Sequence, residues 1–339
     1  MSSPHPALVD VEDVRARIDA VLARHVGQMR AVLAAASDDA DRLADAVIRV
    51  GAALELFQAA ALFHDDVMDD SDTRRGFPAA HRAFAALHAE HGLTGDAERF
   101  GMSAAILLGD LTLVASEQEF AGALATQPEQ RAARARAVFD LMRTEVTVGQ
   151  YLDVLAQSLP WGEDPVADEA RSRQVIRAKA ARYSVEHPIT LGAALADADE
   201  DALEACRELG LPLGEAFQLR DDLLGVFGDP EATGKPAGDD LREGKRTVLT
   251  ARAVARARAC GDEATVDLLR TRLGDRMLTA SDITELADAI KATGAPDDIE
   301  QLIESLAGAA FAVIDTRGWP EPARGQLVGL AHAAVDRHS

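Results

Sequence analysis

The chain has 339 residues, a formal net charge of −22 and an apolar share of 47%, enough to bury a large core. The acidic excess argues against nucleic acid and anionic membrane surfaces as partners, because both require clustered lysine and arginine. Cys206 and Cys260 are isolated in the sequence and the first residues show no leader pattern, so we expect a cytoplasmic protein.

Apolar residues recur at spacings of three and four along almost the whole chain, which is typical of helices. The spacing predicts helices over 11–33, 41–70, 96–124, 129–156, 168–181, 184–195 and 201–227, then four or five shorter ones between 245 and 337. Breaks rich in Gly and Pro interrupt the pattern as inter-helix loops at 71–79, 157–167 and 228–244. No β-type alternation persists, and charged residues interrupt each apolar run, so we expect no membrane span and one all-α domain over residues 1–339.

The string HDDVMDDSDTRRG occupies residues 64–76. Asp65 and Asp69 are four residues apart, as are Asp66 and Asp70, so each pair lies on one helix face. Carboxylates at this spacing repel each other, and the helix dipole disfavours acids at a C-terminal end. The string therefore indicates a site for a hard divalent cation, the alternative being a solvated acidic helix end.

A second acidic string, QLRDDLLGVFGD, ends the helix predicted over 201–227. One helical stripe carries Gln218, Asp221, Asp222 and Gly225, with Asp229 one turn further. Facing helices of a bundle build metal sites from carboxylates. Ligands that offer only oxygen favour magnesium over zinc or iron.

Lysine is rare in this chain, which contains only Lys179, Lys235, Lys245 and Lys291. The first three flank the second acidic string, and Arg74 and Arg75 directly follow the first. Lysine and arginine bind phosphate oxygens well, although such residues are also common as ordinary surface cations. Acids, cations and a Gly-rich loop together indicate a magnesium–diphosphate site.

These motifs resemble the trans-type isoprenyl (polyprenyl) diphosphate synthases, and geranylgeranyl diphosphate synthases in particular. The first acidic string with its arginine pair is similar to the family's first motif, and the second, with GKPAGDDLREGKRT at 234–247, to its second. LLGD at 107–110, GQYLD at 149–153 and AKAARY at 178–183 also fit, in the right order between residues 50 and 250. The resemblance implies an isoprenoid synthase helical bundle around a central cavity, and a homodimer.

The resemblance also implies roles for individual residues. Magnesium would be held by Asp65, Asp66, Asp69, Asp221 and Asp222, which form the catalytic set together with Lys179. The allylic diphosphate would be bound by Arg74, Lys179, Lys235 and Lys245. Arg75 would contact isopentenyl diphosphate, and the surrounding shell would contain Gln150, Asp153 and Gln218. The implied reaction breaks the allylic C–O bond and joins the allylic carbon to the double bond of isopentenyl diphosphate, with loss of a proton.

The sequence departs from the family pattern in three places. Gly225 stands where many members have the last aspartate of the second motif, and Ala180 where they have Ser or Thr. The basic segment Gly-Gly-Lys-Arg-x-Arg-Pro, which binds isopentenyl diphosphate in the family, is missing before Val50. Arg42 and Arg49 are the candidates to replace its cations.

Product length is expected to depend on the helix that carries the first motif. Ala61 and Ala60 lie four and five residues before Asp65, where the resemblance implies the floor of the product pocket. Phe57 lies one turn deeper and is the next candidate floor. Two alanines predict geranylgeranyl diphosphate, with twenty carbons, as the product. Two other functions remain open for this chain: a class I terpene cyclase on the same fold, and a catalytically impaired or regulatory partner subunit.

Overall fold

The computed structural model describes residues 38–228, 238–319 and 321–335, and the statements below concern these residues. They form an almost entirely helical structure, which confirms the predicted all-α class. The elements are α2 (Asp38–Met68), β1 (Thr73–Arg74), β2 (Phe77–Pro78), α3 (Ala80–Glu90), α4 (Ala97–Leu124), α5 (Glu129–Ser158), α6 (Pro165–Val175), η1 (Ile176–Glu186), α7 (His187–Leu195), α8 (Glu200–Phe227), α10 (Asp239–Glu243), α11 (Val248–Ala259), α12 (Glu263–Arg272), α13 (Ala280–Ala292), α14 (Ala295–Arg317) and α15 (Ala323–Val335).

Side-chain caps fix where several of these helices begin. Asp96 accepts a hydrogen bond from the backbone N–H of Arg99 at the start of α4, and Asp199 accepts one from Ala202 at the start of α8. Such caps satisfy backbone donors that have no partner inside the helix. The helices predicted over 41–70, 96–124, 129–156 and 201–227 are confirmed as α2, α4, α5 and α8. The helix predicted over 11–33 lies outside the described residues.

Two regions differ from the prediction. No helix was predicted at α3, whose apolar pattern is short and lies between Gly and Pro residues. The helices predicted over 168–181 and 184–195 are one continuous run of α6, η1 and α7, in which η1 is a π-helix of 11 residues. The wider turns of a π-helix shift the apolar spacing away from the α-helical period, so the pattern appeared broken.

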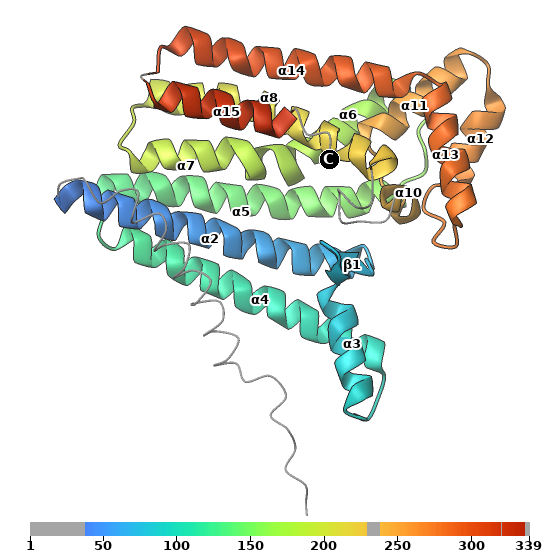
Figure 1. The fold of residues 1–339 in the computed structure, drawn as a ribbon, viewed down its shortest axis with the longest axis horizontal. Coiled ribbons are helices and arrows are strands. Elements are labelled where there is room, and N and C mark those ends of the chain that lie inside the picture. Colours follow the sequence, from blue (N-terminus) through green and yellow to red (C-terminus); the bar gives the residue numbers. More distant parts are fainter. Residues whose placement is uncertain (1–37, 229–237, 320, 336–339) are drawn as a thin grey trace, which may run out of the picture.

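The long helices lie side by side, with α14 along one edge and α4 along the opposite edge (Figure 1). One hydrophobic cluster involves α2, α4, α5 and α7 and includes Phe57, Phe120 and Phe139. A second cluster involves α8 and the C-terminal helices and includes Leu209 and Leu249. The π-helix η1 packs against both α5 and α8, so it joins the two parts of the bundle.

Two helices are long and apolar enough to cross a membrane by length and composition, namely Leu43–Met68 and Ala97–Leu124. No apolar run of that length was expected from the sequence, because charged residues such as Glu55 and Asp110 interrupt the two segments. These segments pack against each other as α2 and α4, and α2 contributes to the hydrophobic core of the bundle. The core helix of a globular protein passes the same test of length and hydropathy.

Candidate active site

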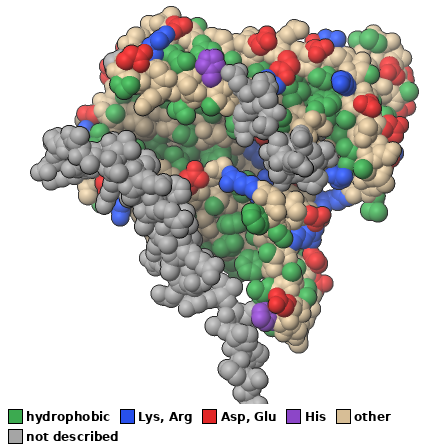
Figure 2. All heavy atoms as spheres, viewed as in Figure 1, with side chains coloured by type: hydrophobic (Ala, Val, Ile, Leu, Met, Phe, Trp, Pro, Cys, Tyr) green, Lys and Arg blue, Asp and Glu red, His purple; other side chains and the backbone are tan. Residues whose placement is uncertain are grey.

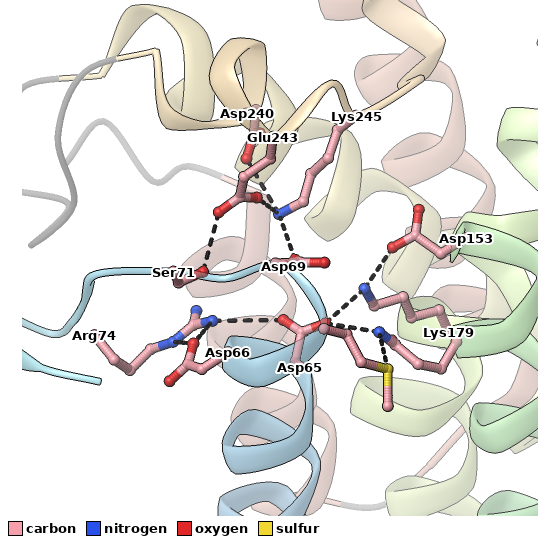
Figure 3. A network of polar contacts seen from close by, with 12 residues as sticks. Asp65, Asp66, Asp69, Ser71, Arg74, Asp153, Lys179, Asp240, Glu243 and Lys245 are labelled. Carbon is pink, nitrogen blue, oxygen red and sulfur yellow. Dashed lines mark hydrogen bonds and ion pairs between the residues drawn. The ribbon is translucent and has the colours of Figure 1, made fainter. Parts of the chain in front are cut away.

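The first carboxylate set lies at the C-terminal end of α2. Asp65 and Asp66 belong to its last turns, Asp69 follows directly, and Asp66 and Asp69 are buried. The β1–β2 hairpin then turns the chain so that Arg74 folds back onto the helix end (Figure 3). Its Nε donates a hydrogen bond to Asp66 Oδ1 at 2.8 Å, and its Nη2 lies 3.4 Å from Asp65 Oδ2. The hairpin therefore places a guanidinium beside two of the predicted metal ligands.

Lys179 reaches the same carboxylates from η1. Its Nζ donates to Asp65 Oδ1 at 3.0 Å and to Asp153 Oδ2, on α5, at 2.6 Å. Gln150, one turn before Asp153, donates to Asp65 Oδ1 at 2.9 Å. Two neighbouring helices, η1 and α5, thus hold the side chain of Asp65 in one orientation. The GQYLD and AKAARY strings, far apart in sequence, lie together at this point.

Lys245 connects α2 to the loop that follows α10. Its Nζ lies 2.7 Å from Glu243 Oε2, 3.3 Å from Asp240 Oδ1 and 3.7 Å from Asp69 Oδ2. The Ser71 hydroxyl donates to Glu243 Oε1 at 3.2 Å and makes a second link between the same segments. Figure 3 shows this group directly above the Asp65, Arg74 and Lys179 group.

The second carboxylate set lies at the C-terminal end of α8. Asp222 is buried, and its Oδ1 accepts a hydrogen bond from Gln218 Nε2 at 2.9 Å, one turn earlier. Asp221 is more exposed and lies at the edge of a cavity of about 250 Å³. This cavity brings the two sets together, because its lining includes Asp65, Arg74, Gln150, Asp153, Lys179, Gln218, Asp221, Asp222 and Lys245.

The carboxylates of the site differ in how well nearby cations compensate their negative charge. Burial opposes the ionisation of Asp65, but the nearby charges of Lys179, Lys245 and Arg74 outweigh it and hold its pKa well below the usual range. Burial, followed by repulsion from Asp65, raises the pKa of Asp69 to about 7. Burial also raises the pKa of Asp222 well above its usual value, with a further contribution from the charge of Asp240. The cations present therefore neutralise one carboxylate well and leave two others poorly compensated.

The residues present fit a divalent cation. Asp69 Oδ2 and Asp222 Oδ2 are both buried without a hydrogen-bond partner, one in each carboxylate set. Within the described residues, no group of three acidic, histidine or cysteine side chains is arranged to hold a metal by itself. Magnesium commonly takes one or two carboxylates and completes its octahedron with water and phosphate oxygens. The arrangement suits a metal that binds together with a diphosphate.

The predicted chain-length residues differ in their positions. Ala61 lines the cavity, whereas Ala60 is fully buried and Phe57 lies beneath the lining. Tyr183, from η1, lines the cavity and packs on Phe57 with ring centroids 5.8 Å apart. Below them, Phe57 contacts Phe139 at 6.5 Å. Tyr183 therefore lies between the cavity and the predicted deeper floor.

Several predicted residues are not brought into the site. Arg75 is exposed at the hairpin turn, with φ of 52°, and does not line the cavity. Arg49 pairs with Asp45 and Glu119, roughly four turns or about 24 Å before Asp65 along α2. Arg49 therefore lies far from the first motif, and its role in place of the missing basic segment stays a prediction. Lys235 and Asp229 lie outside the described residues, as does the side chain of Arg42.

The cavity also contains residues that the sequence analysis did not select. Gln58 lies two turns before Asp65 on the same face of α2, a spacing that the helical period makes visible. Asp240 belongs to the GKPAGDDLREGKRT string, which resembles part of the family's second motif but in which only the lysines were given roles. Tyr183 and Ser184 follow Lys179 and Ala180 by four positions in η1, a relation that becomes clear only once the π-helix is known.

Comparison with known proteins gives consistent matches. A family model described as polyprenyl synthetase matches residues 15–289. The geranylfarnesyl diphosphate synthase of Aeropyrum pernix is 32% identical over 259 residues, which are 75% of this chain and 70% of that protein. The octaprenyl diphosphate synthase of Escherichia coli is 30% identical over 322 residues, covering 93% of this chain and 86% of that protein.

A solved structure agrees with these sequence matches. The geranylgeranyl pyrophosphate synthase of Corynebacterium glutamicum, in complex with isoprenyl diphosphate and magnesium, superposes with a TM-score of 0.82 at 35% identity. The match covers 97% of this chain and 100% of that one. At this level of similarity the helical architecture is shared almost completely.

Proposed function

The chain belongs to the polyprenyl synthetase family, and from this premise we propose that it condenses an allylic diphosphate with isopentenyl diphosphate to give a longer prenyl diphosphate. The observation that carries the proposal is the convergence of two carboxylate sets, from α2 and α8, on one cavity that also contains Arg74, Lys179 and Lys245. Diphosphate chemistry needs both kinds of group, since the cations bind phosphate oxygens and the carboxylates bind the metal.

Magnesium is the proposed cofactor, held by Asp65, Asp66 and Asp69 on one side and by Asp221 and Asp222 on the other. When bound, it would neutralise the negative charge of the departing diphosphate. The two buried carboxylate oxygens without partners support this assignment. In the same proposal, Lys235 joins Arg74, Lys179 and Lys245 at the allylic diphosphate, and Arg75 contacts isopentenyl diphosphate.

The chain's own residues contribute binding, orientation and exclusion of water. Arg74, Lys179 and Lys245 present cations to the cavity from three different segments, so they can surround a diphosphate. Lys179 and Gln150 orient Asp65 beforehand, which reduces the reorganisation needed when substrate binds. Part of the remaining wall is apolar, with Ala61, Leu62, Val146, Val175 and Ile176, and would shield an allylic cation from water.

The proposed product is geranylgeranyl diphosphate. Ala61 leaves room beside the first motif, and the ring of Tyr183 closes the space below, supported by Phe57. Behind Phe57, Phe139 stacks on Phe120 with ring centroids 3.8 Å apart, so the floor rests on packed aromatic rings. A floor of this kind does not yield easily to a growing chain.

Incubation of the full-length protein with magnesium, isopentenyl diphosphate and an allylic diphosphate tests the proposal. A longer prenyl diphosphate is expected. A hydrocarbon would instead indicate a terpene cyclase, and no product from any allylic starter would indicate a partner subunit. We place the reaction in the cytoplasm as part of the same proposal.

A further inference from the structure

One acid of the first string, Asp70, has no place in the proposed metal set. It follows Asp66 by four residues, but α2 ends at Met68, so the helical spacing does not extend to it. The expectation that Asp66 and Asp70 share a helix face is therefore wrong. The side chain of Asp70 is exposed and does not line the active-site cavity. Its position beyond the helix calls for another role.

The backbone of Asp70 lies in the left-handed region, with φ of 55°. This conformation ends α2 in a Schellman motif, in which the N–H of Ser71 donates to the carbonyl of Asp66 at 2.9 Å. Glycine usually occupies the left-handed position of such a motif, because a side chain there costs energy. This chain accepts that cost at the residue directly after Asp69, a proposed metal ligand.

Two arginines from other parts of the fold hold the Asp70 carboxylate. Arg82, on α3, donates from Nη2 to Asp70 Oδ1 at 3.0 Å. Arg276, in the loop between α12 and α13, pairs with Asp70 Oδ2. The same guanidinium donates from Nη2 to the backbone carbonyl of Asp69 at 2.9 Å. Arg276 therefore bridges Asp69 and Asp70, and fixes the backbone that carries the Asp69 carboxylate.

The loop that carries Arg276 is itself held against the segment that carries Lys245. The N–H of Gly274 donates to a carbonyl of α10 at 2.9 Å. A Cβ atom on Gly244 would lie 2.8 Å from Gly274 Cα, so the two backbones pack directly against each other. Gly244 immediately precedes Lys245, whose Nζ lies 3.7 Å from Asp69 Oδ2. The loop thus fixes the end of α2 relative to a cation of the site.

We propose that Asp70 is a positioning residue: anchored by Arg82 and Arg276, it holds the left-handed turn that directs the Asp69 carboxylate toward the metal. The inference rests on the proposed function, in which Asp69 binds magnesium. It gives Asp70 a role without contact to metal or substrate. The ion pairs of Asp70 are partly exposed and contribute little to overall stability. Their loss should therefore affect metal binding more than folding.

Magnesium affinity in the presence of inorganic pyrophosphate, measured by titration calorimetry on the full chain, tests the inference. Arg276→Ala and Asp70→Gly should each weaken magnesium binding by about tenfold to a hundredfold, as loss of a group that orients a metal ligand does. Glu98→Ala is the matched control, since it removes another ion pair of Arg82, at 2.7 Å, without touching α2. This control should bind magnesium as the parent does.

Thermal unfolding separates positioning from a role in stability. Glycine suits the left-handed backbone, so Asp70→Gly should keep the unfolding midpoint of the parent while its magnesium affinity falls. A midpoint that falls together with the affinity would overturn the inference. Arg276→Lys retains a charged donor and should bind magnesium more tightly than Arg276→Ala.

The arginine variant also separates positioning from direct coordination by Asp70. If Asp70 held the metal itself, Arg276→Ala would leave its carboxylate in place and the affinity would not fall. Unchanged affinity in Arg276→Ala and Asp70→Gly, with binding lost in Asp65→Ala, would refute the anchor and leave the proposed function standing. Unchanged affinity in Asp65→Ala as well would refute the metal set of the proposed function itself.

Discussion

At the scale of single residues, the cations of the site pair with carboxylates from other segments. Lys179 on η1 bridges Asp65 on α2 and Asp153 on α5, while Lys245 lies among carboxylates of α2 and α10. Substrate and metal must replace some of these ion pairs when they bind. Until then, the ion pairs keep the charged side chains in position around the cavity. Their loss should affect binding and rate more than folding.

Replacement of Asp65 should lower the activity most. Asp65→Ala should lower kcat by about a thousandfold or more, because removal of a metal ligand forfeits several kcal/mol of leaving-group stabilisation. Steady-state kinetics at saturating magnesium measure this. Asp72→Ala, an exposed acid in the same string, is the control and should retain activity. Full activity of the parent in excess EDTA would contradict the role of the metal.

Product length should respond to the two residues that border the lower cavity. Ala61→Phe fills the space beside the first motif and should shorten the product to fifteen carbons, whereas Tyr183→Ala opens the floor and should lengthen it. Phe57→Ala should lengthen it less, since Tyr183 still lies above. Chromatography of the dephosphorylated products measures the product length of each variant. Tyr183→Phe keeps the ring and should leave the product unchanged; an unchanged product in Ala61→Phe would mean that the floor lies elsewhere.

At the scale of elements, η1 is held between two helices that approach its backbone closely. A Cβ atom on Gly149 of α5 would lie 2.4 Å from Lys179 N, and one on Gly214 of α8 would lie 2.4 Å from Ala181 O. Both contacts are with backbone, which has little freedom to move away. The glycines therefore set the position of η1, and with it the positions of Lys179 and Tyr183.

Gly149→Ala should accordingly push η1 away from α5. We expect a loss of about 1–3 kcal/mol in the free energy of unfolding, as for other overpacked sites, together with a fall in kcat/KM as Lys179 leaves Asp65. Urea unfolding and kinetics report the two effects. Gly192→Ala, on α7 with open space around it, should instead gain about 0.4–1 kcal/mol and keep its activity. Equal changes in unfolding free energy and in kcat/KM for the two variants would refute the steric role of Gly149.

At the scale of the whole molecule, α4 and α5 present an apolar surface to solvent. The exposed side chains on α4 include Leu107, Leu111 and Val114, spaced as one helical stripe. On α5 they include Leu141, Val148 and Tyr151. Ion pairs from Glu117 to Arg136 and Arg143 tie the two helices together. So large an apolar surface is typical of an interface, and a second copy of the chain is the occupant we propose, as a two-fold dimer.

Leu107→Glu should disrupt that dimer, because two buried carboxylates would face the apolar stripe across the two-fold axis. Light scattering coupled to size exclusion should show a shift from dimer to monomer. Leu330→Glu on α15, with nearly the same exposure, should remain dimeric. A monomeric parent protein would overturn the assignment of this surface.

The bundle and the first acidic set could be predicted from sequence, because both depend on local helical spacing around residues such as Asp65 and Asp69. Gln150 became a candidate only through family resemblance, and Lys179 was first selected because lysine is rare in the chain; their meeting with Asp65 depends on the packing of three helices, which no local pattern reveals. Asp240 and the floor at Tyr183 escaped prediction. The first requires the α10 segment to fold back on Gly225, and the second depends on a π-helix whose period no α-helical pattern reveals.

Figure 2 shows a hollow on one face of the molecule, with apolar side chains within it and Lys or Arg side chains at its edge. The chain that forms this hollow has a net charge of −22. A diphosphate must therefore approach against a repulsive field, because the site's own cations are largely cancelled by their carboxylate partners. Dissolved salt shortens the reach of that field from about 30 Å at 0.01 M to about 8 Å at 0.15 M. Substrate capture, followed as kcat/KM at saturating magnesium, should thus speed up with ionic strength over this range, the reverse of what a basic enzyme shows toward the same anion.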